Sequence, residues 1–406
     1  MNILIVSEVF FPENFIVNDL AEEWKIMGHN VEVLTPYPSY PYSYVYDGYV
    51  NKGYTIEDWN GIQIHRFPFV EGYRDSVRKK IANYCSYVKE GIKLAKEISK
   101  NFDCIFVSQT GPLTVALPAI AARKKWGIPV AIWTQDIWPD AVYSYGIPNN
   151  AVTNYFIDRL IKYIYNHCDE IFISSKRFEE TISKYVEKHC VYTPNWLKPT
   201  ENQESSLRLD KEKFHFTFTG NVSRFQNLIN TVRGFAAAKL DDCILNIVGD
   251  GSFLNQVKDV VDEENIENVE FHGRFPYNEM NDILCQSNAL VLPLIPDEGI
   301  MKTEPFKIQS YLNAGKPILG ILGGSGQDII EGHKLGICTN PNDVQDIARG
   351  FREMVAFSNL HGEEVRVAAG CLMNSRFNKS IIVSTFTERL IELSSKRPPM
   401  TSCRKF

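Results

Sequence analysis

Residues 303–317, TEPFKIQSYLNAGKP, could bind an anion at the start of a helix. Pro305 suits a first helical position, where free backbone N–H groups and the helix dipole favour a negative charge. Lys307 falls in the first turn, where the dipole favours acids, so a lysine at that position is expected to face a phosphate. The alternative is a structural lysine that bridges the helix to a neighbouring acid.

Glycines follow three apolar runs in the second half of the chain and could let loops approach a ligand closely. In TGNVSRFQN, Gly220 would admit a diphosphate and Arg224 could supply a bidentate donor. Gly-Asp-Gly at 249–251 is the second case, and Gly273 with Arg274 is the third, where amides could read a base edge and the arginine could cover its face. A surface loop or a plain strand-end turn explains each pattern as well, and the glycines do not form a dinucleotide fingerprint.

In the first half, WTQDIWPD at 133–140 places two acids after an apolar run. Asp136 and Asp140 could hold a substrate hydroxyl or stabilise positive charge that develops in a transition state. Asp136 has the stronger claim because it follows the run at once. Asp140 comes directly after Pro139 and also suits a helix cap.

Short apolar runs alternate with helical patterns, such as those at 18–27 and 84–99, and this alternation is typical of a parallel α/β sheet covered on both faces. Ligands of such sheets bind outside the carboxyl ends of the strands, so the residues after each run are the ones that could do chemistry. Strands are expected at 2–7, 31–35, 104–108, 129–134 and 170–174, and again at 214–219, 245–248, 269–272, 289–294 and 317–320.

The length of 406 residues exceeds the usual single domain of about 100 to 200 residues, so we expect two domains. The alternation breaks at 193–199, TPNWLKP, which carries two prolines ahead of a polar stretch. We interpret this segment as the interdomain linker.

Composition narrows the class of protein. The net charge of −6 argues against a general nucleic-acid binder. Nine cysteines are scattered without a zinc or redox spacing, which favours a reduced cytosolic protein. The N-terminus lacks the basic lead of a signal peptide, and no apolar run approaches the roughly 20 residues that span a bilayer. We expect a cytoplasmic protein that touches a membrane, if at all, from its surface.

Two basic clusters bear on that membrane contact. Arg74 lies near 78–80, and 123–125 lie beside Trp126. Such clusters could rest on anionic lipid headgroups, or they could be solvated helix faces.

A set of motifs in a characteristic order resembles family-4 glycosyltransferases of the two-domain GT-B fold, and most closely the subgroup of O-antigen and capsule polysaccharide biosynthesis. The motifs are MNILIVSEVFFPE, GHNVEVLTPYPSYP, WTQDIWPD, FTGNVSRFQN, IVGDGS, FHGRFPYNEM and the 303–317 segment. The resemblance implies two Rossmann-like domains whose parallel sheets face each other across a cleft. These would be an acceptor-side domain at 1–195, a nucleotide-sugar domain at 205–375, and a helix at 376–396 that crosses back to the first domain.

The resemblance also implies roles for individual residues. Catalytic roles fall on Asp136, Lys307 and Arg224, donor contacts on Gly220, Asn221, Gly249, Gly251, Gly273, Arg274, Phe306 and Ser310, and acceptor contacts on Glu13, Asn14 and Asp140. The chain departs from the broad family after Gly220, where Asn221 replaces the usual arginine and Gln226-Asn227 replaces a Lys-Gly pair.

A second departure concerns two glutamates that many family members carry eight residues apart. Their positions fall here on Lys302 and Ser310, so the acidic pair is missing. Ser310 could still donate to a ribose oxygen, and Glu298 or Glu304 would have to replace the first acid. The subgroup keeps the lysine ahead of this helix, which favours Lys307 for the leaving diphosphate.

We therefore expect an enzyme, a retaining glycosyltransferase that moves a sugar from a UDP-sugar to a polyprenyl-diphosphate-linked glycan, with an N-acetylated or deoxy amino sugar favoured. No Asp-x-Asp motif is evident, so we expect no metal and no cofactor beyond the donor. The expected location is the cytoplasm, at the inner face of the cytoplasmic membrane, with no nucleic-acid partner. The alternatives are a UDP-sugar 2-epimerase of the same fold and a non-catalytic scaffold subunit.

Overall fold

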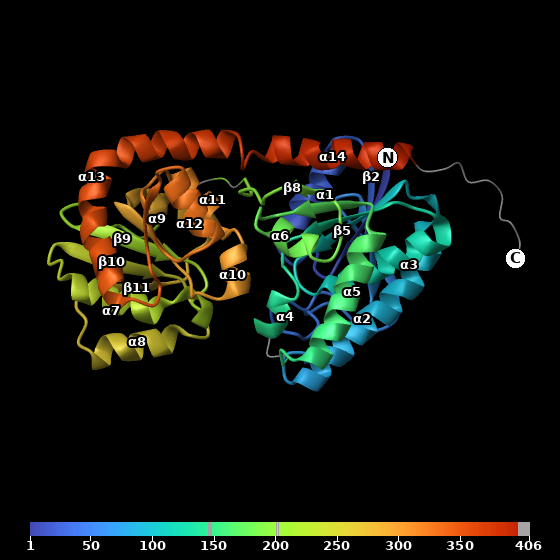
Figure 1. The fold of residues 1–406 in the computed structure, drawn as a ribbon, viewed down its shortest axis with the longest axis horizontal. Coiled ribbons are helices and arrows are strands. Elements are labelled where there is room, and N and C mark those ends of the chain that lie inside the picture. Colours follow the sequence, from blue (N-terminus) through green and yellow to red (C-terminus); the bar gives the residue numbers. More distant parts are fainter. Residues whose placement is uncertain (145–147, 200, 202, 397–406) are drawn as a thin grey trace, which may run out of the picture. The chain divides into compact units, whose positions relative to one another are not determined.

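A computed structural model describes residues 1–144, 148–199, 201 and 203–396. The chain divides into two compact units (Figure 1). Unit 1 comprises residues 1–194 and the segment from Ser380 onward, and unit 2 comprises Asn195–Lys379. The division between the units falls inside the predicted linker at 193–199, and the return of the chain to unit 1 near Ser380 agrees with the predicted crossing helix.

Unit 1 is built on an eight-stranded sheet of order β3-β4-β2-β1-β5-β6-β7-β8. Neighbouring strands are parallel except for the antiparallel pair β3 and β4. The strands are β1 (Asn2–Ser7), β2 (Asn30–Pro36), β3 (Thr55–Trp59), β4 (Ile62–Phe67), β5 (Cys104–Gln109), β6 (Val130–Thr134), β7 (Glu170–Ile173) and β8 (Cys190–Tyr192). The central strands are buried throughout, as expected for a parallel sheet covered on both faces.

The helices of unit 1 connect these strands. They are α1 (Ile16–Ile26), α2 (Val77–Ile98), α3 (Leu117–Trp126), α4 (Asp140–Ser144), α5 (Ala151–His167) and α6 (Phe178–Ser183), with the 3-10 helices η1 (Ser99–Asn101) and η2 (Leu113–Ala116). The final helix, α14 (Lys379–Ser395), begins close to the predicted position.

Aromatic packing fixes α14 in unit 1. The Phe386 ring lies 4.7–5.3 Å, centroid to centroid, from three rings of the central strands, Phe106, Trp133 and Phe172. Trp24 of α1 donates its indole N–H to Thr387 Oγ1 at 3.0 Å. The last helix of the sequence therefore completes the core of the first unit.

Unit 2 has a six-stranded, all-parallel sheet of order β11-β10-β9-β12-β13-β14. Its strands are β9 (Phe214–Thr219), β10 (Cys243–Val248), β11 (Val269–Gly273), β12 (Ala289–Pro293), β13 (Ile318–Ile321) and β14 (Gly336–Thr339). Its helices are α7 (Leu228–Ala238), α8 (Leu254–Glu263), α9 (Met280–Gln286), α10 (Glu298–Lys302), α11 (Lys307–Ala314), α12 (Ser325–Gly332) and α13 (Val344–Asn374), with η3 (Arg224–Gln226) and η4 (Tyr277–Glu279).

The sequence reading found the central strands of both sheets and missed the hairpin of β3 and β4. These two strands are joined by a two-residue loop, Asn60-Gly61, in which both residues have positive φ, 52° and 74°. Asn-Gly is the preferred sequence for such a turn and was the available signal. β3 is rich in polar residues because it is the exposed edge of the sheet. β4 carries the buried polar residues His65 and Arg66, so its apolar pattern is weak as well.

Strand order reverses once in each sheet. In unit 1, β1 lies between β2 and β5, and in unit 2, β9 lies between β10 and β12. A crevice opens outside the carboxyl ends of the strands at such a point, and ligands of open α/β sheets bind there. The residues after β1 and β5, and after β9 and β12, are therefore the ones that the fold positions for function.

Candidate functional site

Lys307 opens α11 in unit 2. Pro305 lies two residues earlier, and its carbonyl accepts the N–H of Ile308 at 3.0 Å. Phe306 is the N-cap and already has helical backbone angles, so the helix starts two residues later than predicted. The shift leaves the expected placement intact, because Lys307 still lies in the first turn of the helix.

The Lys307 side chain folds back over the end of β9. Its ammonium group donates to Gln226 Oε1 at 2.5 Å and lies 3.8 Å from the centroid of the Phe218 ring. Burial lowers the pKa of Lys307 to about 7. The hydrogen-bond partner is an amide and not a carboxylate, which differs from the predicted alternative of a bridge to an acid. Lys307 is therefore a half-buried cation at the switch point of the sheet, and it loses its proton near neutral pH.

Gly220 makes the room for this lysine. A Cβ atom on Gly220 would lie 2.8 Å from Lys307 Cε and 3.2 Å from its Nζ, and the residue has a φ of 124°. Glycine is required both by this backbone conformation and by the approach of the side chain.

Gly249 and Gly251 hold the next loop against the first one. A Cβ on Gly249 would lie 1.9 Å from the Gly220 carbonyl oxygen, and one on Gly251 would lie 2.2 Å from that of Val222. The loops are tied by a hydrogen bond from the Val222 N–H to the Asp250 carbonyl at 2.9 Å. These glycines therefore pack loop against loop, which the sequence reading had not distinguished from a plain turn or a ligand approach.

The two predicted arginines of unit 2 are exposed at the same edge of the sheet. Arg224 lies in η3, with its guanidinium 4.8 Å from the centroid of the Phe225 ring. Arg274 follows β11, and its Nε lies 3.8 Å from Asp250 Oδ2. Both side chains belong to loops at the carboxyl ends of the strands, where they can move toward an anion.

The remaining donor contacts predicted in unit 2 occupy the same loops. Gly273 accepts the N–H of Gly249 through its carbonyl at 2.7 Å, and Asn221 is exposed beside Gly220. Phe306 is 55% exposed, and Ser310 lies one turn after Lys307 on α11. Their donor contacts stay predictions.

Glu304, one candidate for the missing acid, has a charged partner inside unit 2. It is buried and forms an ion pair with Arg376 at 2.7 Å, between the segment ahead of α11 and the residues after α13. Glu298 lies in the first turn of α10, which Asp297 caps by accepting the N–H groups of Gly299 and Ile300. The carboxyl of Glu304 is thus committed to the fold of unit 2.

In unit 1, Asp136 follows β6 as predicted. The side chain of Gln109, the last residue of β5, connects Asp136 to the loop after that strand. Its amide N–H groups donate to the Asp136 carbonyl at 2.8 Å and to the Gly111 carbonyl at 2.6 Å. Burial raises the pKa of Asp136 to about 7, and the nearby Asp140 carboxyl adds to the rise. Asp140 is the first residue of α4, one position inside the helix from the cap that the sequence allowed, and its acceptor contact stays a prediction.

Glu8 is a candidate that the sequence reading missed. It follows β1 directly, beside the loop after β5, where a Cβ on Gly111 would lie 2.7 Å from Glu8 Oε2. Burial raises the pKa of Glu8 to about 7, and the carboxyls of Glu13 and Asp136 act in the same direction. The signal was an acid placed directly after the first strand.

Glu13 is built into the loop after β1. Its carboxylate is buried and accepts the N–H groups of Phe10, Ser39 and Tyr40 at 3.2, 2.8 and 2.6 Å. These bonds tie the loop to the segment after β2, which is a structural role that the sequence reading had not foreseen. Asn14 beside it is exposed. The predicted acceptor contacts of both residues are untested.

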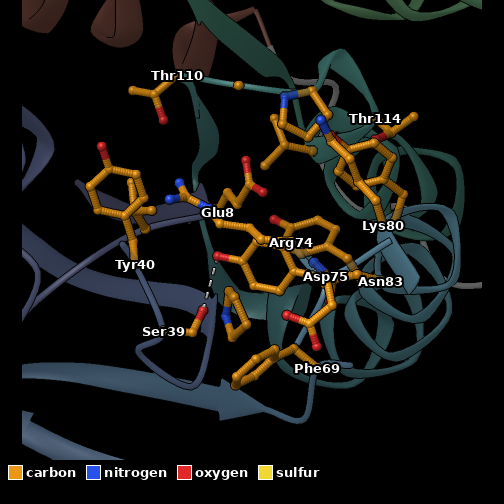
Figure 2. A pocket seen from close by; sticks show the side chains of 18 of the residues that line it. Glu8, Ser39, Tyr40, Phe69, Arg74, Asp75, Lys80, Asn83, Thr110 and Thr114 are labelled. Atoms are coloured by element: carbon orange, nitrogen blue, oxygen red, sulfur yellow. Dashed lines mark hydrogen bonds between the residues drawn. The ribbon is translucent and has the colours of Figure 1, made fainter. Parts of the chain in front are cut away.

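A pocket of about 630 Å³ lies outside the carboxyl ends of β1 and β5 in unit 1. Figure 2 shows Glu8 in its middle, with Tyr40 to one side and Lys80 to the other. Arg74, Lys80, Ser39 and Thr110 also line it, together with aromatic rings. The pocket occupies the switch point of the first sheet.

Neither a metal-binding cluster nor a membrane-spanning helix is found in the part of the chain that the structure describes. In the described ranges, no group of three or more His, Cys, Asp and Glu side chains could hold a metal ion. Among the helices that the structure describes, none is both long and apolar enough to cross a bilayer.

Comparison with known proteins agrees with the division of the chain into two α/β units. Residues 14–196 match the family model described as a glycosyl transferase 4-like domain, and residues 199–362 match that of glycosyl transferases group 1. The chain is 24% identical over 264 residues to the probable glycosyltransferase WbjE of Pseudomonas aeruginosa, covering 62% of this chain and 66% of that protein.

Solved structures share the fold. Sucrose-phosphate synthase from Thermosynechococcus elongatus superposes with a TM-score of 0.71 at 15% identity, over 97% of this chain and 100% of that one. Anabaena HepE, solved in complex with UDP, gives a TM-score of 0.69 at 13% identity over the same shares.

Two Rossmann-like units with parallel sheets, together with these matches, define a glycosyltransferase of the GT-B architecture. Unit 1 carries the glycosyl transferase 4-like domain and unit 2 the glycosyl transferases group 1 domain.

Proposed function

We propose that this glycosyltransferase moves a sugar from a UDP-sugar to a polyprenyl-diphosphate-linked glycan, with retention at the anomeric carbon and without a metal. The observation that carries the donor half of the proposal is the half-buried Lys307 ammonium at the switch point of unit 2, over the glycine loop. A related fold, Anabaena HepE, was solved with UDP, which supports a uridine nucleotide as donor.

Lys307 acts on the leaving group in this proposal. As the bond between the anomeric carbon and the diphosphate breaks, negative charge grows on the phosphate oxygens, and a fixed cation there lowers the barrier. The same anion raises the pKa of Lys307, because an opposite charge stabilises the protonated form. Arg224 and the N-terminus of α11 add positive potential at the same edge of the sheet.

The acceptor half of the proposal rests on unit 1. The acceptor hydroxyl oxygen forms the new bond to the anomeric carbon, and its proton passes to the leaving diphosphate. Asp136, placed directly after β6, stabilises the positive charge on the sugar ring in its ionised form. We favour an N-acetylated or deoxy amino sugar as the transferred group, in O-antigen or capsule assembly.

The protein's place in the cell is part of the same proposal. We place it in the cytoplasm, at the inner face of the cytoplasmic membrane. Support comes from the start of α2, where Val77 and Ile81 are more than half exposed next to Arg78 and Lys79. Exposed apolar side chains interleaved with cations are typical of a surface that rests on anionic lipid.

The test is a transfer assay with the full chain, a panel of UDP-sugars and a lipid-linked glycan extract as acceptor. We expect release of UDP and a mass increase of one sugar on the acceptor, both reduced by orders of magnitude in Lys307→Met. Lys211→Met, an exposed lysine of the same unit, is the matched control and should retain activity. Release of UDP without a glycosylated product would contradict the acceptor half.

A further inference from the structure

The pocket of unit 1 has a charge pattern that the proposed transfer does not by itself require. Two cations lower the pKa of the Glu8 carboxyl by their charge. They are Arg74, in the turn before α2, and Lys80, in the first turns of that helix. The two cations also repel each other. Burial and the charge of Arg74 lower the pKa of Lys80, while the Glu8 carboxyl raises it. The two cations thus converge on Glu8, which is only partly ionised near neutral pH, while the second acid of the lining, Asp75, is paired with Lys79 outside it. An anionic ligand would relieve this repulsion.

The other walls of the pocket suit a sugar ring. The Phe15 and Tyr40 rings meet edge to face at 5.2 Å, and the Arg74 guanidinium lies 5.2 Å from the Tyr40 centroid. Tyr73 is held by Ser39, whose Oγ lies 3.4 Å from the Tyr73 hydroxyl (Figure 2). Aromatic faces bordered by hydroxyl groups give both the apolar surface and the polar contacts that a pyranose offers.

The size of the pocket limits how far the anion can be from the reacting hydroxyl. A cavity of about 630 Å³ encloses a drug-sized ligand and not a long glycan. Arg74, Lys80 and Glu8 all line this one cavity, so an anion at the cations and a hydroxyl at Glu8 must belong to the same short unit.

Resting on the proposed function, we infer that this pocket binds a glycosyl phosphate or diphosphate, with the anionic group between Arg74 and Lys80 and a sugar hydroxyl on Glu8. The acceptor is then a short lipid-linked glycan whose phosphate is one or two sugars from the growing end. The reaction that supplies it must be the class that first joins a sugar phosphate to a lipid phosphate.

The experiment is calorimetric titration of the full chain with N-acetylglucosamine 1-phosphate in saturating UDP, so that the Lys307 site is already filled. N-acetylglucosamine and inorganic phosphate serve as the uncharged and sugar-free probes. We expect the sugar phosphate to bind at least tenfold more tightly than either probe. Arg74→Met/Lys80→Met should abolish that preference. Lys89→Met/Lys96→Met, which removes two exposed cations of α2 outside the pocket lining, should keep it.

Glu8→Gln gives a second, independent readout. The variant keeps the size and the hydrogen-bonding ends of the side chain and removes its charge, so it should bind the sugar phosphate at least as tightly as the wild type at pH 8. Equal binding of sugar and sugar phosphate by a wild type that binds UDP would overturn the inference and leave the proposed function standing. Absence of UDP binding would instead overturn the proposed function.

Discussion

Lys307 and Gln226, 81 positions apart, are joined by a hydrogen bond of 2.5 Å from ammonium to amide oxygen. The amide satisfies the lysine without neutralising it, whereas a carboxylate would form an ion pair that an incoming phosphate must break. Gln226 stands where the resemblance expects part of a Lys-Gly pair. The departure from the family pattern therefore leaves the Lys307 ammonium bonded to a neutral amide of the loop, and the burial of Lys307 makes its charge depend on the ligand.

Glycine substitutions should rank by the contact that a Cβ would make. Gly249→Ala should be the most damaging, because its Cβ would lie 1.9 Å from a backbone oxygen. Gly220→Ala should cost about 1–3 kcal/mol of unfolding free energy from backbone strain and should weaken UDP binding by displacing Lys307. Gly273→Ala has the strained φ of 71° without a contact, so it should affect stability alone.

Urea unfolding and UDP titration of the three variants measure this order. An unchanged UDP affinity in a folded Gly220→Ala protein would contradict the assigned position of Lys307.

The ion pair of Glu304 and Arg376 should be a stability element. Removing one partner leaves a buried charge without its counterion, which costs about 3–5 kcal/mol. Glu304→Gln and Arg376→Met should each lower the unfolding free energy, and the double variant should lose less than the sum. A Glu304→Gln protein of normal stability that no longer binds UDP would show that the acid serves the donor after all.

Carboxyl groups of unit 1 should make stability fall with rising pH. The pKa values of Glu8 and Asp136 rise to about 7 from ordinary values of 4.5 and 3.8, so the folded state holds protons that the unfolded chain has released. The contribution of these two carboxyls to the unfolding free energy should therefore decrease from about pH 4.5 to 7 and stay constant above. Above pH 7 the total should rise again, because the pKa of Lys307 falls to about 7 in the folded state and the unfolded chain then binds the extra proton. Besides Asp136, the groups whose charges interact with that of Glu8 are Glu13, Arg74, Lys80, Tyr73 and Tyr87.

Chemical unfolding of the wild type and of Glu8→Gln/Asp136→Asn between pH 5 and 8 checks this prediction. The double variant should show a flatter profile. A wild-type stability that rises over this range, with the same profile in the variant, would contradict the assignment.

Phe386 should be essential to unit 1 although it comes near the end of the chain. Its ring fills the space between three aromatic residues of the central strands. Phe386→Ala should cost about 3–5 kcal/mol, as expected for loss of a buried aromatic ring. Ile391→Ala, on the same helix but 48% exposed, is the control and should cost far less. Equal effects in thermal unfolding would rule out this packing.

The sequence predicted those parts of the molecule that depend on local pattern. Buried strands such as β1 and β12 are nearly continuous apolar runs, and Lys307 was recognisable from the helix start around it. Contacts between distant loops carry no such local signal. The fate of Glu304 depends on Arg376, 72 positions away, and the requirement for Gly249 comes from the carbonyl of Gly220. Glu8 was overlooked because an acid after a strand has meaning only once the strand order is known.

Proton uptake on UDP binding tests the central claim most directly. Free Lys307 is largely neutral at pH 8, since its pKa is about 7, and a bound diphosphate, itself fully ionised there, should restore its charge. Titration of UDP at pH 8 in two buffers of different ionisation enthalpy should show uptake of about one proton by the wild type. Lys307→Met should lose both the uptake and most of the affinity. UDP binding of equal strength in the two proteins, without proton uptake, would contradict the account.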